Sequence, residues 1–177
     1  MTVPSLTDYI WYEPGWVDSA FCDEVVARAE DTNYHSGTIM SGEVLKTVRD
    51  VNITAIRQWP DLDHKLFEIY GSAIREYCGK HTDLHIERDE GYSLLKYDCT
   101  QSYSQHVDHG TAIPRSVTAI IGLNEEYTGG EFFFWDGAWQ QKIEKGALLM
   151  FPASFQYPHG IRQILSGTRY SVITWFL

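Results

Sequence analysis

The feature that most constrains the fold is a series of short strand-like segments that fills the chain from Gly91 to its end. Seven such segments lie at residues 92–97, 103–108, 116–123, 131–135, 139–143, 147–151 and 169–176. The third is almost entirely apolar, as expected of a central strand that is buried on both faces. The Asp136-Gly137 pair between the fourth and fifth segments is a strong hairpin signal. Short strands at this spacing predict a β-sandwich or a β-barrel.

The first half of the chain differs, because it contains two segments whose apolar residues recur at helical spacing. The first covers residues 18–30, and Asp18 is placed to cap its N-terminus. The second begins at Pro60 and runs to about residue 78, where Gly79 is expected to end it. The other expected elements are short strands at residues 9–12 and 50–57 and a loop or loose hairpin at residues 32–46. Helices followed by a run of strands predict an α+β protein with a two-layer β core.

Length and composition limit the remaining possibilities. A chain of 177 residues predicts one domain, residues 1–177, in which residues 1–91 supply helices and flanking strands and residues 92–177 supply the β core. A domain of this size can bury enough surface to fold without staples. The net charge of −10 argues against a nucleic-acid partner, because gripping a phosphate backbone requires a basic face. No run of 18 apolar residues is present, so we expect no membrane-spanning helix.

The cysteines and the first residues of the chain predict a cytoplasmic protein. Three cysteines, Cys22, Cys78 and Cys99, cannot all pair with one another and show no C-x-x-C spacing. Residues 1–16 contain two acidic residues and no basic region, which is unlike a signal peptide. Reduced thiols in a cytoplasm are the simplest interpretation of both observations.

The most informative motif is His106-Val107-Asp108, which lies at the end of a predicted strand. Side chains alternate along a strand, so His106 and Asp108 point to the same face. A third ligand is available in His159, 53 residues after His106. Two histidines and one carboxylate on one face of a metal ion, with the opposite positions open, are the ligand set of non-haem Fe(II) oxygenases. The alternative is a surface histidine, a capping aspartate and a histidine in a turn.

Other histidines are weaker ligand candidates. His109 faces away from His106 if the strand continues, which favours a role at the surface or behind the ligands. His81 and His85 are four residues apart, but Gly79 is expected to have ended the helix before them. Solvated histidines are therefore the favoured interpretation of that pair.

The order of the motifs is similar to that of a known family. A basic residue, Arg169, lies ten residues after His159. The accompanying motifs are Gly129-Gly130-Glu131, Phe151-Pro152 and Arg169-Tyr170-Ser171. Together with His106-x-Asp108, this order resembles the Fe(II)/2-oxoglutarate dioxygenases, and most closely their prolyl 4-hydroxylase-like branch. The resemblance covers residues 92–177 well and residues 1–91 loosely; it implies a double-stranded β-helix, or jelly roll, with the N-terminal helices supporting one outer face.

The resemblance also implies roles for individual residues. His106, Asp108 and His159 would be the catalytic Fe(II) ligands, and Arg169 would hold the distal carboxylate of 2-oxoglutarate, whose planar shape a guanidinium matches. An internal salt bridge is the alternative for Arg169. The other expected cofactor-binding residues are Tyr97, as a hydrogen-bond partner of 2-oxoglutarate, Thr118, on the wall of its pocket, and Ser171 and Trp175, which share a strand face with Arg169. Gly122 stands where many prolyl hydroxylases have a tyrosine, which would remove one wall of the pocket.

The implied activity is hydroxylation of a C–H bond with Fe(II), 2-oxoglutarate and O2, releasing succinate and CO2, with ascorbate as a possible reductant. Asp108 is retained, whereas halogenating relatives replace this carboxylate by a small residue. A prolyl residue in a peptide or protein is the first substrate class. A free amino acid or small metabolite is the second, and a non-catalytic metal-binding jelly roll is the rival interpretation. The loop at residues 32–46, with Ile39 and Met40, would be a lid over the substrate or only a connector. The oligomeric state is left open.

Overall fold

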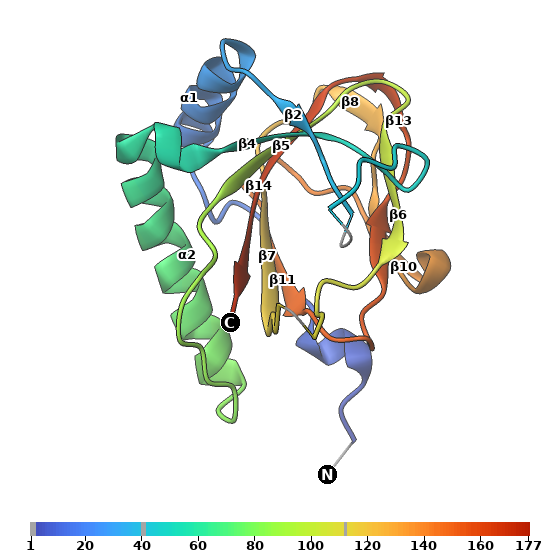
Figure 1. Ribbon diagram of the computed structural model, residues 1–177. Helices are drawn as coiled ribbons and strands as arrows, with labels where there is room; N and C mark the ends of the chain where they lie inside the picture. Colours follow the sequence, from blue (N-terminus) through green and yellow to red (C-terminus); the bar gives the residue numbers. More distant parts are fainter. Residues whose placement is uncertain (1–2, 40–41, 112) are drawn as a thin grey trace.

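The computed structural model describes residues 3–39, 42–111 and 113–177. Two antiparallel sheets face each other, and the two long helices cover the outer face of the larger sheet (Figure 1). The helical elements are η1 (Leu6–Tyr9), α1 (Ser19–Glu30), η2 (Ile56–Gln58), α2 (Pro60–Lys80) and η3 (Trp135–Gly137). None of the helices within these ranges is long and apolar enough to cross a membrane.

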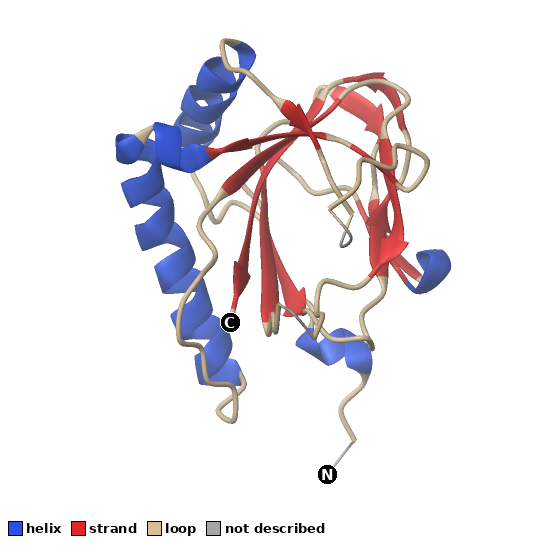
Figure 2. Ribbon diagram, viewed as in Figure 1, coloured by secondary structure: helices blue, strands red, loops and turns tan. Residues whose placement is uncertain are grey.

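The larger sheet contains seven strands and the smaller sheet five. In spatial order, the larger sheet is β1 (Trp11–Glu13), β11 (Leu148–Pro152), β7 (Val117–Gly122), β14 (Arg169–Phe176), β5 (Ser93–Tyr97), β4 (Asn52–Ala55) and β2 (His35–Ser36). The smaller sheet is β10 (Trp139–Gln141), β9 (Phe132–Phe134), β12 (His159–Ile161), β6 (Ser102–His106) and β3 (Arg49–Asp50). A separate pair is formed by β8 (Tyr127–Gly129) and β13 (Ile164–Gly167), both labelled in Figure 1, and Figure 2 shows the strands in red and the helices in blue. This arrangement confirms the predicted α+β fold with a jelly-roll core and supporting N-terminal helices.

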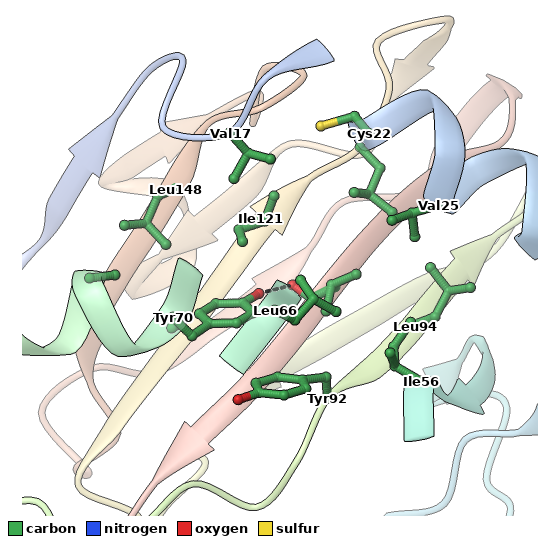
Figure 3. Close-up of a cluster of buried hydrophobic side chains, with 14 of the residues drawn as sticks. Val17, Cys22, Val25, Ile56, Leu66, Tyr70, Tyr92, Leu94, Ile121 and Leu148 are labelled. Carbon is green, nitrogen blue, oxygen red and sulfur yellow. Dashed lines mark hydrogen bonds between the residues drawn. The ribbon is translucent and has the colours of Figure 1, made fainter. Parts of the chain in front are cut away.

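The alternation of side chains along β14 creates two cores. Tyr170, Val172 and Phe176 face the helices, whereas Ile173 faces the smaller sheet. In the helix-side core, shown in Figure 3, the Tyr70 hydroxyl of α2 donates a 2.8 Å hydrogen bond to the carbonyl oxygen of Val172. Helix α2 is therefore fastened to the central strands by apolar contacts and by a buried hydrogen bond. The opposite face of β14 is free to line the space between the sheets, where the candidate site lies.

Several element boundaries differ from the sequence prediction. Gly79 does not end α2, because it keeps a helical conformation and the helix continues to Lys80. The first predicted strand begins two residues later than expected, since Tyr9 belongs to η1. The expected strand at residues 50–57 divides into β3, β4 and η2, and the expected strand at 103–108 ends at His106. Strands β8, β12 and β13 were not predicted. The Asp18 cap is confirmed, because its carboxylate accepts a 2.8 Å hydrogen bond from the Phe21 amide.

Candidate active site

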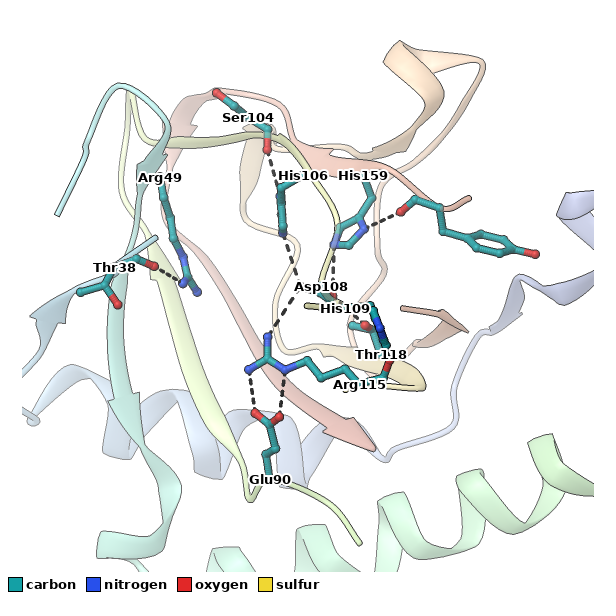
Figure 4. Close-up of polar contacts among 11 residues, drawn as sticks. Thr38, Arg49, Glu90, Ser104, His106, Asp108, His109, Arg115, Thr118 and His159 are labelled. Carbon is teal, nitrogen blue, oxygen red and sulfur yellow. Dashed lines mark hydrogen bonds and ion pairs between the residues drawn. The ribbon is translucent and has the colours of Figure 1, made fainter. Parts of the chain in front are cut away.

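The three predicted ligands come from two neighbouring strands and the loop that follows one of them. His106 ends β6 and lies directly opposite His159, the first residue of β12, in the antiparallel register. Asp108 follows two residues after His106, and its carboxylate points toward both imidazoles (Figure 4). The potential ligand atoms of all three residues lie within 4.8 Å of one another. Among the residues that the structure describes, they form the one group of three or more such ligands.

The distances between these atoms suit a single metal ion. The Nε2 atom of His106 is 3.6 Å from one Asp108 carboxylate oxygen, and that of His159 is 3.3 Å from the other. Ligand bonds of about 2.1 Å that meet at right angles separate neighbouring ligand atoms by about 3 Å. The ligand atoms therefore need to move only slightly to coordinate an ion between them.

The backbone selects the tautomer of both histidines. The Nδ1 atom of His106 lies 2.9 Å from the Ser104 carbonyl oxygen, and that of His159 lies 2.9 Å from the Tyr157 carbonyl oxygen. A carbonyl can only accept, so Nδ1 carries the proton and Nε2 presents its lone pair to the cluster. Burial lowers the pKa of His106, which also favours the neutral imidazole that metal binding requires.

Asp108 is held as a carboxylate from behind. Burial alone would raise its pKa, but the two adjacent histidines, His159 and His106, together hold it well below its usual range. Thr118 on β7 donates a 2.6 Å hydrogen bond to the same oxygen that faces His159. Thr118 thus supports Asp108 from behind and is not among the residues that line the cavity, which differs from the position on the pocket wall that the resemblance implies.

Arg169 is the most deeply buried cation of the site. Its side chain is only 1% exposed and lines the cavity that also contains His106, Asp108 and His159. The Nη1 atom donates a 2.9 Å hydrogen bond to the Ser171 hydroxyl, whereas Nε and Nη2 are buried without any hydrogen-bond partner. No described carboxylate forms an ion pair with Arg169, so its unpaired N–H groups fit a carboxylate that enters the cavity.

Three further predicted residues line the same cavity. Tyr97 lies on β5 opposite Arg169, and burial raises the pKa of its hydroxyl to about 12, so the hydroxyl remains neutral. Ser171 lines the cavity and orients Arg169. Trp175 presents a ring 3.7 Å from the Arg115 guanidinium carbon, and its Nε1–H is buried without a partner.

Neighbouring atoms occupy the space next to the Gly122 α-carbon. A Cβ atom at this position would lie 2.5 Å from the Glu144 carbonyl oxygen and 3.0 Å from the Ile143 side chain. The segment before β11 therefore fills the volume that a side chain on Gly122 would need. The expectation that glycine at this position widens the pocket is not supported by this packing.

Some residues of the site were missed or left undecided by the sequence. Tyr103 stacks on His106 with ring centroids 3.6 Å apart, and Arg115 makes two hydrogen bonds, of 2.9 and 2.6 Å, to Glu90. Arg49 also lines the cavity, from a strand of two residues. Arg115 lies in the connection between Asp108 and β7, and its position there was the available signal. No sequence pattern pointed to Arg49.

The rival histidines do not join the cluster. His109 directs Nδ1 to the Arg115 carbonyl oxygen, 2.9 Å away, and its side chain is exposed. His81 caps the C-terminus of α2, and its ring packs against Tyr9 and Tyr77 at centroid distances of 5.1 and 4.6 Å. Their positions agree with the interpretation that neither binds the metal.

The jelly roll with two histidines and an aspartate between its sheets defines a class, the non-haem Fe(II) oxygenases. Residues 92–177 match the sequence profile of the 2OG-Fe(II) oxygenase superfamily. This match relates the β core of the chain, residues 92–177, to that superfamily. Members of the superfamily use Fe(II), 2-oxoglutarate and O2.

Two curated relatives match parts of the chain. A PKHD-type hydroxylase of Alteromonas mediterranea is 29% identical over 92 residues, which cover 45% of this chain and 40% of the relative. Human prolyl 3-hydroxylase 2 is 28% identical over 67 residues, which cover 35% of this chain and 10% of the relative. The chain thus spans less than half the length of these relatives.

Solved structures of other proteins superpose on nearly the whole chain. A prolyl hydroxylase of Trichoplax adhaerens, in complex with a hypoxia inducible factor peptide fragment, superposes with a TM-score of 0.83 at 19% identity, covering 97% of this chain and 84% of that one. A prolyl 4-hydroxylase of Pseudomonas putida gives a TM-score of 0.78 at 21% identity, with 95% and 92% covered. At these identities the similarity establishes the fold.

Proposed function

We propose that the protein is an Fe(II)- and 2-oxoglutarate-dependent dioxygenase that hydroxylates a C–H bond. The proposed substrate class is a prolyl residue in a peptide or protein. His106, Asp108 and His159 hold the metal, and Arg169 binds the distal carboxylate of 2-oxoglutarate. When bound, the iron supplies the activation of dioxygen, which oxidises 2-oxoglutarate to succinate and CO2 and transfers one oxygen atom to the substrate. Ascorbate is a suitable reductant for returning the iron to its ferrous state.

The observation that carries this proposal is the pair of unpaired N–H groups on Arg169. A buried guanidinium without an anion is costly, because the charge has lost its water and has gained no partner. The same cavity contains the metal cluster, so one bound molecule can present a carboxylate to Arg169 and other oxygens to the metal. A module that only held a metal ion would have no use for this second, anion-binding position.

The other cavity residues have parts in the same proposal. The Tyr97 hydroxyl stays protonated because its pKa is raised, so it can donate a hydrogen bond to a 2-oxoglutarate oxygen. Ser171 fixes the guanidinium plane through its 2.9 Å contact with Nη1. Trp175 lines the cavity and offers one unpaired N–H donor. Thr118 acts indirectly, because its hydrogen bond orients the Asp108 ligand.

The outer groove supports a peptide substrate. A groove of about 540 Å³ opens over His106 and Asp108 and is bounded by Ile39, Val48 and Ile113. Such a volume is typical of sites that hold a ligand of several residues or a drug-sized molecule. The prolyl hydroxylase neighbours support the prolyl class, and a free amino acid or small metabolite remains the alternative. Ile39 lines this groove, which supports the proposal that residues 32–46 form a lid, and Met40 lies outside the described residues.

The proposal also covers the number of domains and the cellular location of the protein. Residues 1–177 would act as one domain, because the larger sheet combines strands from both halves of the chain. A cytoplasmic location is supported by three free cysteines, Cys22, Cys78 and Cys99.

A mass measurement tests the proposed function. The purified protein, loaded with Fe(II), is incubated with 2-oxoglutarate, ascorbate and air, and with either a panel of proline-containing peptides or a panel of free amino acids. We expect succinate to form and one peptide class to gain about 16 Da, the mass of one oxygen atom. Asp108→Ala is the control and should do neither. If only a free amino acid gains oxygen, the substrate is a free amino acid and not a peptide. If no succinate forms under any condition, the protein is a non-catalytic metal-binding module.

A further inference from the structure

A second arginine, Arg49, stands at the boundary between the inner cavity and the outer groove and lines both. It belongs to β3 and lies directly opposite Tyr103 of β6 in the antiparallel register. Its guanidinium carbon is 4.8 Å from the centre of the Tyr103 ring, and that ring stacks on His106. Arg49 is therefore one aromatic ring away from a proposed metal ligand, on the side of His106 opposite His159 (Figure 4).

The hydrogen bonds of Arg49 leave part of its donor capacity unused. Nη1 donates a 2.6 Å hydrogen bond to the Thr38 carbonyl oxygen. Nε is buried and has no hydrogen-bond partner, and Nη2 makes no hydrogen bond to any described residue. The Nη2 group of Arg49 therefore remains able to bind a carboxylate, whereas Nε is covered by the segment at Gly37.

The charges around Arg49 are not balanced by the protein itself. The other cation of the groove, Arg115, is neutralised by Glu90 through hydrogen bonds of 2.9 and 2.6 Å. Arg49 forms no ion pair with a carboxylate of residues 3–39, 42–111 or 113–177, and the one acidic residue among those that line the groove is the proposed ligand Asp108. Because the chain has a net charge of −10, the absence of a described carboxylate partner for Arg49 does not reflect a shortage of acidic residues.

Apolar surface adjoins this unpaired cation. Val48, Ile39 and Ile113 line the outer groove together with Arg49. A ligand that fits the groove should combine apolar contacts with one negative charge. Because Arg49 lies beyond His106 on the groove side, that charge belongs to a part of the ligand that does not enter the inner cavity.

From this geometry we infer that Arg49 selects substrates that carry a carboxylate close to the residue to be hydroxylated. The inference rests on the proposed function and narrows its substrate class to acidic peptides. The carboxylate is that of an aspartate or glutamate side chain or of a C-terminus, since both offer the same two oxygens to the guanidinium. Arg49 is thus a specificity-determining residue, distinct from Arg169, which binds the co-substrate.

Binding of defined peptide pools tests the inference. The protein is loaded with Mn(II) and 2-oxoglutarate, so that peptides are bound without being consumed. The first pool contains capped nine-residue peptides with one central proline and one Asp or Glu at a random flanking position, and the second replaces that residue by Asn or Gln. A third pool has only uncharged side chains but keeps a free C-terminal carboxylate near the proline. Fluorescence anisotropy gives the affinity of each pool.

We expect the first or third pool to bind the wild type at least about tenfold more tightly than the amide pool, as one charged hydrogen bond would give. Whichever acidic pool binds identifies the source of the carboxylate. Arg49→Gln should abolish the preference and Arg49→Lys should retain part of it, although both remove the Nη1 group that donates a hydrogen bond to the Thr38 carbonyl oxygen. Lys46→Gln is the matched control, because Lys46 is an exposed cation of the same segment and does not line the groove.

Equal binding of all pools, absence of binding by all of them, or a preference that survives in Arg49→Gln would overturn the inference. Failure of the proposed function is read separately, by calorimetric titration of 2-oxoglutarate into the Mn(II)-loaded wild type. If 2-oxoglutarate binds while no acidic preference is seen, the inference about Arg49 alone is wrong. If 2-oxoglutarate does not bind, the assignment of the co-substrate is wrong as well.

Discussion

Replacing Arg169 tests how the site recognises its co-substrate. Arg169→Met removes the charge and keeps a side chain of similar length. Two nitrogen atoms of Arg169, Nε and Nη2, are buried and unpaired, and each charged hydrogen bond contributes about 1.5–3 kcal/mol. Loss of both should weaken 2-oxoglutarate binding by about 3 kcal/mol or more, which is roughly a hundredfold. Arg169→Lys keeps a point charge and should lose about ten- to a hundredfold.

Thermal unfolding of the Mn(II)-loaded protein measures this effect. A ligand at 100 times its dissociation constant stabilises the folded state by about 2.7 kcal/mol. For a chain of this size that raises the Tm by roughly 5–10 °C. At the same concentration, Arg169→Met should gain only about 1 °C. Without 2-oxoglutarate, the variant should unfold at the wild-type temperature or above it, because an unpaired buried charge has been removed.

The control is Arg162→Met, which removes an exposed guanidinium whose Nη2 donates a 3.0 Å hydrogen bond to the Asp136 carbonyl oxygen. This variant should keep the full thermal shift. The reasoning is refuted if Arg169→Met retains the wild-type shift with 2-oxoglutarate. It is also refuted if the ligand-free Arg169→Met protein is strongly destabilised, since that would mean Arg169 serves an internal contact.

Three other predictions concern residues around the site. Thr118→Val, which removes the 2.6 Å hydrogen bond to Asp108, should lower metal affinity by about ten- to a hundredfold in a competition titration; unchanged affinity would contradict the orienting role. Ile39→Ser should raise the KM for the peptide identified in the mass assay and leave 2-oxoglutarate affinity unchanged, whereas an unaltered KM would make this segment a connector. Gly122→Ala should lower stability by about 1–3 kcal/mol in urea unfolding, because its Cβ would lie 2.5 Å from the Glu144 carbonyl oxygen, and wild-type stability would show that the segment can yield.

The parts of the fold that the sequence predicted are those in which local pattern and tertiary packing agree. The alternation along β14 separated Arg169 and Ser171 from Tyr170 and Val172, and the structure places the two pairs on opposite faces of the sheet. The buried strand β7 and the Asp18 helix cap were predicted for the same reason. In each case the local signal is strong enough to be read without knowing the neighbouring strands.

The missed elements depend on partners that are distant in the sequence. β12 has only three residues, His159–Ile161, and exists because it pairs with β6 and β9 on either side. The continuation of α2 through Gly79 costs only about 1 kcal/mol relative to alanine, which the packing of the rest of the helix can offset. The volume at Gly122 is filled by a segment that lies more than 20 residues later in the sequence, so composition alone could not show it.

The candidate site shows the same division. The spacing of His106, Asp108 and His159 was readable, because two ligands share a strand end and the third has the right residue type. The position of Arg49 between the inner cavity and the outer groove could not be predicted from the sequence. Arg49 belongs to a strand of two residues, and the register of that strand with β6 depends on the tertiary structure. The unpaired state of Arg169 is likewise a property of its three-dimensional surroundings.

The most direct test of the proposed site is a crystal structure of the protein soaked with Mn(II) and 2-oxoglutarate, with anomalous diffraction used to place the metal. We predict one strong anomalous peak about 2.1–2.2 Å from Nε2 of His106, Nε2 of His159 and one carboxylate oxygen of Asp108. The distal carboxylate of 2-oxoglutarate should accept hydrogen bonds from Nε and Nη2 of Arg169. A metal bound elsewhere, or a co-substrate whose distal carboxylate avoids Arg169, would contradict the assignment of this site.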